Sequence, residues 1–155
     1  MSVRFAKAED LDRVNELRKQ VNDLHSEALP AIFKKGFPEE LRDYVFAIFG
    51  DPLKKILVCE RDDAICGVAI LNHITRPSTP FMHERDFLDI DEFCVDEACR
   101  RQGVASELID FISDYAKSQG FDRIELNKWE FNSGALEFYE AAGFTTYRRY
   151  MEKKL

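Results

Sequence analysis

The stretch Phe87-Leu-Asp-Ile-Asp-Glu-Phe-Cys-Val95, followed closely by Arg100-Arg-Gln-Gly-Val-Ala105, decides the fold of this chain. Its first part is strand-like, and the apolar residues after its second part recur at helical spacing. The segment is therefore expected to run from a strand through a short loop into a helix. The first amides of a helix lack partners inside it, and the helix dipole adds partial positive charge there. A phosphate or pyrophosphate suits that position, although a basic loop before an ordinary helix explains these residues alone equally well.

Two familiar phosphate motifs are excluded, and with them a nucleotide-binding α/β protein. A Walker loop needs Gly-Lys-Ser/Thr, which occurs nowhere in the sequence. A dinucleotide fingerprint needs three spaced glycines, whereas Val104 and Ala105 follow Gly103. What remains, Arg100-x-x-Gly103-x-Ala105, resembles the acyl-CoA pyrophosphate loop of the GNAT superfamily, the acetyl-CoA-dependent N-acetyltransferases.

A second stretch, Asn132-Ser-Gly-Ala-Leu-Glu-Phe-Tyr139 with Gly143-Phe144 after it, resembles the other CoA-side signature of that family. Asn132 or Ser133 can cap a helix, because either side-chain oxygen can accept an early amide. Gly143 is a suitable left-handed residue at the end of that helix. The two motifs have the order and separation that the family shows, and the resemblance covers nearly the whole chain.

Size, composition and charge agree with one enzyme-sized domain over residues 1–155. The chain is 45% apolar, which is enough for a real core at this length. A net charge of −7 argues against nucleic acid as the main partner, because duplex binding depends on Lys and Arg. No apolar run is long enough to cross a bilayer, and the first residues lack a signal-peptide pattern, so no membrane partner and a cytoplasmic location are expected. A homodimer is compatible with such a chain.

The four cysteines, Cys59, Cys66, Cys94 and Cys99, are interpreted as reduced, small apolar residues. They show no Cys-x-x-Cys spacing and no clustered histidines, so no metal site is predicted. If Asp62-Asp63 forms the tip of a hairpin, Cys59 and Cys66 would lie opposite one another.

The spacing of apolar residues predicts a mixed α/β chain without repeats or linkers. Strands are expected at 3–6, 55–59, 65–71, 87–95, 123–127 and 144–152, and helices at 9–21, 38–49, 104–119 and from 132. A link is expected at 24–36 and a longer loop or irregular hairpin at 72–86. This order matches the layout of the GNAT family, which implies a mostly antiparallel sheet with helices on both faces and two splayed central parallel strands.

The resemblance also implies where acetyl-CoA, the expected co-substrate, is held. The pyrophosphate would lie at the loop and helix entrance, the pantetheine arm along the backbone of the central strand, and the Asn132 helix beside it. The residues assigned to cofactor binding are Phe93, Cys94, Val95, Arg100, Arg101, Gln102, Gly103, Val104, Ala105, Ser106, Asn132, Ala135, Phe138 and Tyr139.

Direct attack of an amine on the thioester, which the family implies, needs a proton acceptor and a proton donor. Tyr139 falls on the family position beside the CoA sulfur and would protonate the leaving thiolate; its alternative role is aromatic packing. Asp91 and Glu92 are the first candidates for the base, and Asp89 is the next. Asp89 and Asp91 share a strand face, while Glu92 faces the other unless a bulge intervenes. A solvated acidic edge is the alternative for all three.

The acceptor, a small-molecule amine or a peptide or protein amine, would bind between the first two helices and the loop before the central strand. Candidate binding residues there are His25, Phe33, Phe37, His73, Phe81 and His83, and His73 is a further candidate base. No motif in these segments identifies the acceptor. A non-catalytic acyl-CoA sensor or interaction module with the same fold is the rival interpretation, but it would not need Tyr139 or the strand carboxylates.

Overall fold

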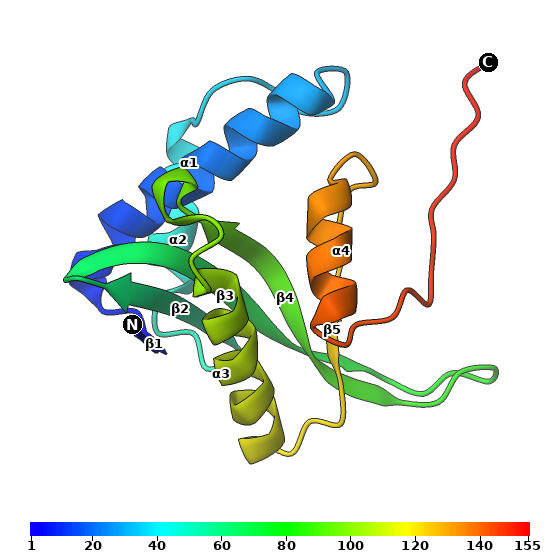
Figure 1. The fold of residues 1–155 in the computed structure, drawn as a ribbon. Coiled ribbons are helices and arrows are strands. Elements are labelled where there is room, and N and C mark those ends of the chain that lie inside the picture. Colours follow the sequence, from blue (N-terminus) through cyan, green and yellow to red (C-terminus); the bar gives the residue numbers. More distant parts are fainter.

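A computed structural model describes residues 1–155 as a five-stranded sheet flanked by helices (Figure 1). The elements are β1 (Ser2–Phe5), a 3-10 turn (Ala8–Asp10), α1 (Leu11–Ala28), α2 (Glu39–Ile48), β2 (Lys54–Arg61), β3 (Ala64–Arg76), β4 (Arg85–Val95), a second 3-10 turn (Glu97–Cys99), α3 (Val104–Ser118), β5 (Ile124–Leu126) and α4 (Ser133–Ala141). The strands follow one another across the sheet in chain order. Neighbours are antiparallel from β1 to β4, and β4 pairs with β5 in parallel.

Alternation of apolar side chains along β2, β3 and β4 builds a core on each face of the sheet. One core joins Leu57, Leu71 and Ile90 to the apolar stripe of α3. The other joins Val58, Ile70 and their neighbours to α1 and α2. The expected mixed sheet with helices on both faces is therefore confirmed.

The two parallel strands separate soon after they meet. Only three residue pairs join them, ending at Ile90 opposite Leu126, while β4 continues to Val95. Residues 91–95 of β4 consequently have no strand partner on the side of β5, and this part of the sheet is split. The expected splay of two parallel strands is confirmed, but β5 lies at the edge of the sheet rather than at its centre, because no strand follows it.

The helices and hairpins lie at the positions that the sequence predicts, but several of these elements are longer than predicted. Helix α1 continues through Ala28 into the segment predicted as a link. Strand β3 extends to Arg76 and β4 begins at Arg85, so residues 72–86 form the irregular hairpin rather than a loop. Asp62 and Asp63 form the tip of the β2–β3 hairpin with positive φ, as expected.

The prediction of a last strand at residues 144–152 is wrong, because the structure has no strand after α4. After α4 the backbone turns at Gly143, whose φ is +89°, and residues 145–155 then run away from the sheet (Figure 1). They form no main-chain hydrogen bond, and a strand exists only where an edge is available to pair with it. None of the helices combines the length and the apolar character needed to cross a membrane.

Candidate functional site

The loop between β4 and α3 presents a row of free backbone donors. None of the N–H groups from Arg101 to Ser106 donates to another group of the chain. Arg101 and Gly103 have φ values of 60° and 86°, and Gly103 forms the N-cap of α3 without a side-chain cap. Free amides at the start of a helix, together with the helix dipole, are an electropositive group of donors of the kind that can bind an anion. Arg100 and Arg101 are exposed beside these amides.

A glycine in the neighbouring strand lets the start of α3 lie close to the sheet. A Cβ built on Gly67 of β3 would be 2.7 Å from Val104 Cγ1 and 3.0 Å from Leu108 Cδ1. Val104 and Leu108 are fully buried in the first turns of α3. The height of the helix entrance above the sheet is therefore set by the absence of a side chain at Gly67.

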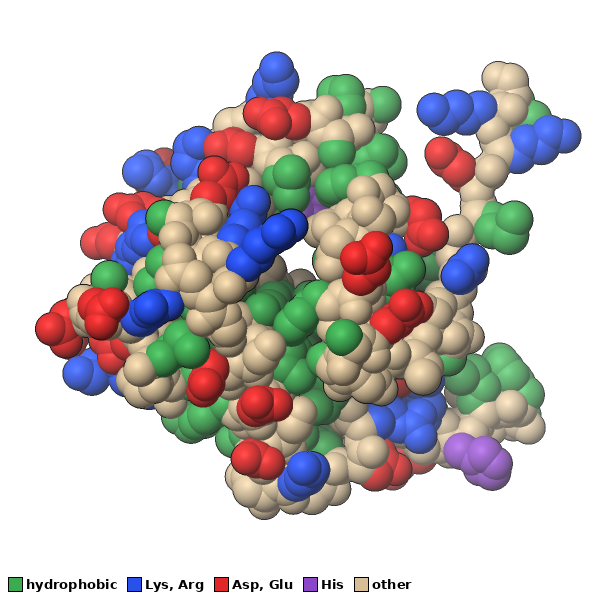
Figure 2. Space-filling model, in the orientation of Figure 1, with side chains coloured by type: hydrophobic (Ala, Val, Ile, Leu, Met, Phe, Trp, Pro, Cys, Tyr) green, Lys and Arg blue, Asp and Glu red, His purple; other side chains and the backbone are tan.

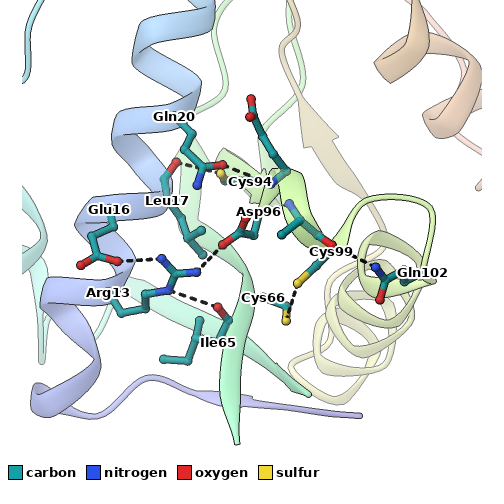
Figure 3. A network of polar contacts seen from close by, with 12 residues as sticks. Arg13, Glu16, Leu17, Gln20, Ile65, Cys66, Cys94, Asp96, Cys99 and Gln102 are labelled. Atoms are coloured by element: carbon teal, nitrogen blue, oxygen red, sulfur yellow. Dashed lines mark hydrogen bonds and ion pairs between the residues drawn. The ribbon is translucent and has the colours of Figure 1, made fainter. Parts of the chain in front are cut away.

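A network of polar contacts fixes the segment before this loop to α1 and β3 (Figure 3). Arg13 of α1 donates to the Asp96 carboxylate, and Asp96 also accepts from the Ala98 amide at 3.0 Å. The Ala98 amide, followed by Arg13, holds the pKa of Asp96 below its usual value. Gln102 donates to the Ala98 carbonyl at 3.0 Å. The end of β4 and the loop before α3 are thus held in one orientation.

The cysteines are all free thiols, but they are not arranged as expected. A bulge shifts the β2–β3 register, so Cys59 lies opposite Gly67 rather than Cys66. Cys66 instead lies beside Cys99, with 2.7 Å between their sulfur atoms (Figure 3). Cys94 donates to the Leu17 carbonyl on the α1 side at 2.9 Å, so only its backbone faces the gap between β4 and β5.

A β-bulge places three acidic residues of β4 on the α1–α2 side of the sheet. Ile70 pairs with Glu92 and Leu71 pairs with Ile90, which leaves Asp91 as an extra residue in β4. Leu88 and Ile90 point into the α3 core, so Asp89 between them points to the opposite side. Past the bulge, Glu92 returns to that same side and contacts α1, as the sequence allowed only if a bulge intervened.

The three carboxylates have different surroundings. Burial, followed by the charges of Asp91 and Glu125, raises the pKa of Asp89 to about 6. Asp91 accepts a hydrogen bond of 3.0 Å from the Tyr44 hydroxyl of α2. Glu92 forms a bidentate pair with Arg18, at 2.7 and 2.8 Å. The Asp89 carboxyl can therefore change its protonation near pH 6.

Arg18 of α1, which the sequence analysis did not single out, organises this side of the sheet. Its side chain is only 5% exposed and also donates to the Asn15 side chain and the Leu41 carbonyl. Its guanidinium group lies over the rings of Phe37 and Tyr44, at 5.5 and 5.2 Å. A helical arginine at an apolar position was the one signal in the sequence that pointed to a buried ion pair.

Tyr139 lies on the other side of the sheet, beside the split between β4 and β5. Its ring packs edge-on against Phe93 of β4 at 6.1 Å and against Phe144 at 5.7 Å. Phe138 stacks on the same Phe93 at 6.3 Å. Burial raises the pKa of the Tyr139 hydroxyl to about 12, so the phenol is neutral and able to donate a proton. No hydrogen-bond partner within the chain occupies its hydroxyl group.

The start of α4 matches the predicted capping. The Asn132 side-chain oxygen accepts a hydrogen bond of 3.1 Å from the Ala135 amide, so this oxygen is already used within the chain. Figure 2 shows a hollow between the loop before α3 and α4, with Lys and Arg side chains on one rim and hydrophobic side chains at its floor. No group of three or more metal-binding side chains lies there or elsewhere in the chain.

Of the six residues expected in the acceptor pocket, two are in contact with one another and a third contacts Arg18 of α1. His25 of α1 packs on Phe33 at 4.9 Å, and Phe37 lies over Arg18. Two residues that the sequence analysis missed complete this group: Phe131 contacts His25 at 5.5 Å, and Trp129 contacts Phe33 at 5.0 Å. The aromatic cluster thereby joins the end of α1 to the loop before α4. The sequence signal for such a contact was the presence of two large aromatic residues, Trp129 and Phe131, directly before the Asn132 cap.

The other half lies elsewhere. His73 is on the α3 side of the sheet, where it contacts Phe121 at 4.7 Å and Asp86 at 2.7 Å. It therefore points away from Asp89, because neighbouring positions of a strand face opposite sides. Phe81 and His83 are exposed in the segment between β3 and β4. Figure 1 shows that this hairpin projects away from α1 and from the loop before α4. The structure does not bring these three residues to the first group.

Comparison with known proteins agrees with this arrangement. The structure of a mutant of the BH1408 protein from Bacillus halodurans matches with a TM-score of 0.95 and 28% identity, over 100% of this chain and 99% of that one. An acetyltransferase from Vibrio fischeri matches with a TM-score of 0.64 and 25% identity, over 81% and 94%. AAC(6')-Iy, solved with the bisubstrate analogue CoA-S-monomethyl-acetylneamine, shares the fold with a TM-score of 0.78 and 16% identity, over 99% of this chain and 97% of that one.

Sequence comparison gives the same family. The uncharacterized N-acetyltransferase MJ1207 of Methanocaldococcus jannaschii is 36% identical over 63 residues, which are 41% of this chain. The match spans 28% of that relative, so the chain corresponds to little more than a quarter of its length. The model of the acetyltransferase (GNAT) family matches residues 18–144. The chain therefore belongs to the GNAT acetyltransferase family.

Proposed function

We propose that the protein is an N-acetyltransferase, which moves the acetyl group of acetyl-CoA to an amine of a small molecule or peptide by direct attack in a ternary complex. Membership of the family supports the acetyl transfer. The donor, the amine acceptor and the roles of individual residues are what the proposal adds. AAC(6')-Iy, which shares the fold, is known with a CoA-linked analogue of an amine acceptor.

Acetyl-CoA would be held by two sets of main-chain groups. Its pyrophosphate would accept hydrogen bonds from the free amides at the start of α3, with Arg100 and Arg101 supplying charge. Its pantetheine arm would lie along residues 93–95 of β4, where β5 has already diverged. An extended arm with amide groups can pair there in the way an added strand does.

The observation that carries the proposal is the position of acid and base on opposite sides of the split sheet. Tyr139 lies on the α3–α4 side of β4, and Asp89 lies on the α1–α2 side. Beyond Ile90, the gap between β4 and β5 connects these two sides. A thioester that enters from the first side would thus meet an amine that enters from the second.

The proton transfers follow from that placement. Asp89 takes a proton from the bound ammonium group, directly or through a water molecule, and the freed amine attacks the acetyl carbonyl carbon. The new C–N bond forms and the C–S bond breaks. Tyr139 gives its proton to the leaving sulfur, and the second proton of the attacking nitrogen passes through water to the Tyr139 phenolate. A base whose pKa is about 6 is ionised at neutral pH, whereas a buried neutral phenol retains its proton. Asp91 and Glu92, already bound to Tyr44 and Arg18, would orient the acceptor.

The acceptor side combines carboxylates with aromatic rings. Asp89 and Asp91 attract a cationic amine, and the cluster of His25, Phe33, Trp129 and Phe131 offers an apolar surface beside the gap. This combination suits an ammonium group carried on an apolar or ring-containing body.

The test is release of free CoA thiol from acetyl-CoA with a panel of polyamines, aminoglycosides, amino acids and peptides. We expect acceptor-dependent thiol release together with N-acetylated product. Binding of acetyl-CoA without release by any acceptor would favour the non-catalytic sensor and contradict the proposal.

A matched pair of glycine variants tests the cofactor site by calorimetry. Gly103→Glu puts a bulky negative side chain where the pyrophosphate is expected, so acetyl-CoA binding should be lost. Gly120→Glu adds the same side chain at a positive-φ glycine at the other end of α3, with open space around it, and should bind normally. Equal binding by both folded variants would show that the pyrophosphate lies elsewhere.

A further inference from the structure

Two cysteines that the proposed reaction does not use lie side by side at the start of the loop before α3. Cys66 lies near the beginning of β3, and Cys99 ends the 3-10 turn directly before Arg100. Their sulfur atoms are 2.7 Å apart (Figure 3), although the two residues are 33 positions apart in the sequence. The pair thus connects the sheet to the segment that leads into the loop.

A β-bulge in β3 directs the side chain of Cys66 towards Cys99. Ile65 and Gly67 pair with consecutive residues of β2, so Cys66 between them is an extra residue without a partner there. Positions two apart in a regular strand share a face, but Ile65 packs against the core beside α1, whereas Gly67 lies against α3. The bulge accounts for this change of face and leaves Cys66 in the core beside α3, where Cys99 also packs.

Main-chain hydrogen bonds hold the other cysteine in place. The Asp96 amide donates to the Cys66 carbonyl at 2.8 Å, and the Cys99 amide donates to the Asp96 carbonyl at 2.9 Å. Asp96 is itself held by Arg13 and by the Ala98 amide. Because the backbone on both sides is fixed, a bond between the two sulfur atoms needs only a small movement of either side chain.

The two thiols differ in their access to solvent. Cys66 is only 5% exposed, and burial, followed by the contact with Cys99, raises the pKa of the Cys66 thiol to about 11. Cys99 is partly exposed in its turn. A small oxidant therefore reaches Cys99 first, while Cys66 stays a protected thiol that only its neighbour can engage. An accessible cysteine beside a buried one is the arrangement in which the second cysteine can trap the oxidised form of the first.

The other two cysteines have no such partner. Cys59 is fully buried in β2, opposite Gly67. Cys94 is buried on the α1 side of the sheet, where its thiol donates to the Leu17 carbonyl. These two residues are therefore matched controls for the pair.

We propose that Cys66 and Cys99 form a reversible disulfide site, which a hydroperoxide oxidises and a dithiol reduces, and which ties the loop before α3 to β3. The Cys99 thiolate attacks one peroxide oxygen, the O–O bond breaks, and the departing hydroxide takes up the proton that Cys99 has lost. The Cys66 sulfur then attacks the sulfur of the resulting sulfenic acid, the S–O bond breaks, and the Cys66 proton leaves with the hydroxyl group as water. Two thiols and one hydrogen peroxide thus give one disulfide and two water molecules.

The bond would strengthen the attachment of the loop without redirecting it. Both residues already have the backbone hydrogen bonds of the folded state. In the unfolded chain the bond would close a loop between positions 33 apart, which lowers the entropy of the unfolded state and favours folding. Oxidation should therefore protect the start of the loop rather than disorder it.

The first test is mass spectrometry of the full chain after treatment with hydrogen peroxide. The oxidised chain should be lighter by about 2 Da, the mass of two hydrogen atoms, and dithiothreitol should restore the original mass. Digestion without reductant should yield the Cys66 peptide joined to the Cys99 peptide. An unchanged mass, a gain of oxygen without a cross-link, or a cross-link between other cysteines would overturn the proposal.

The second test compares Cys99→Ala with Cys59→Ala, which removes a buried thiol from the same core. Cys59→Ala should still form the cross-link, and Cys99→Ala should not. Oxidation should raise the melting temperature of the wild type and of Cys59→Ala by about 5 °C or more, and leave that of Cys99→Ala unchanged. Amide exchange at Asp96 and Cys99 should slow down in the oxidised wild type. A cross-linked wild type that melts at or below the temperature of the reduced protein would show that the bond does not hold the loop to β3.

Discussion

Residues 1–120 and residues 121–155 bury very different amounts of their apolar surface. The first region holds every buried residue, packed on both sides of β1–β4. The second region comprises β5, α4 and residues 145–155, and it contributes only partly buried side chains such as Phe138, Tyr139 and Phe144. The loop before α3 is therefore attached to the packed core, whereas the proposed proton donor lies in a part that the core contacts on one side only. Burial and chemical importance are separate properties in this molecule.

The largest effect is expected from a single atom in the weakly buried region. Tyr139→Phe removes the hydroxyl group and keeps the ring that packs on Phe93. Turnover with acetyl-CoA should fall by about 10²-fold, the usual contribution of one general acid, while the melting temperature changes little because the hydroxyl has no partner. Tyr115→Phe, at a partly buried tyrosine of α3 that packs on Phe5, is the matched control and should leave turnover unchanged. If Tyr139→Phe is fully active, Tyr139 contributes only to packing and does not donate the proton.

The next effect concerns the carboxylate on the opposite side of the sheet. Because the Asp89 pKa is raised to about 6, kcat/KM of the wild type should fall as the pH drops through about 6, where the base becomes protonated. Asp89→Asn should be at least about tenfold slower at pH 7 and should lose that acid limb. Its activity should recover partly at high pH, where solvent releases the free amine from an ammonium group of pKa near 10. An unaltered pH profile would move the base to Asp91 or Glu92, for which the Asn and Gln variants are the check.

Two glycine-to-alanine changes compare the packing of the two regions directly. At Gly67 the new methyl group would collide with Val104 and Leu108, so the free energy of unfolding should fall by about 1–3 kcal/mol and acetyl-CoA should bind more weakly. At Gly134 of α4 nothing lies within 4 Å, so alanine should stabilise the helix by about 0.5–1 kcal/mol. Denaturant unfolding measures both. Equal changes in stability would mean that the two regions are packed alike.

The smallest effect is a pH dependence of stability that arises from Asp89. A carboxyl whose pKa is raised on folding binds its proton more tightly in the folded chain, so it favours folding at low pH. Its contribution should be lost as the pH rises from about 4 to about 6. The free energy of unfolding of Asp89→Asn should therefore be about 1 kcal/mol higher than that of the wild type at pH 8, and equal to it at pH 4. Asp110→Asn, at an exposed position of α3, should show no such difference.

The sequence by itself determined the features that depend on neighbouring residues. The helix after Gly103, the cap by Asn132 and the turn at Gly143 follow from local hydrogen bonding and backbone freedom, so both family motifs were recognisable. The two cores were also predictable in outline, because alternation along a strand and the helical repeat decide which side chains point inward.

Only the tertiary structure decided the features that depend on residues far apart in the chain. The bulge at Asp91 brings three carboxylates to one side, and the buried pair of Arg18 with Glu92 joins positions 74 residues apart. The direction of His73 depends on the strand register, which a shift of one residue reverses. The segment 144–152 has the residues of a strand, but it makes no main-chain hydrogen bond to a sheet edge, and the backbone after Gly143 leads away from the sheet (Figure 1). Propensity is a property of a segment, whereas pairing is a property of two segments brought together by the rest of the fold.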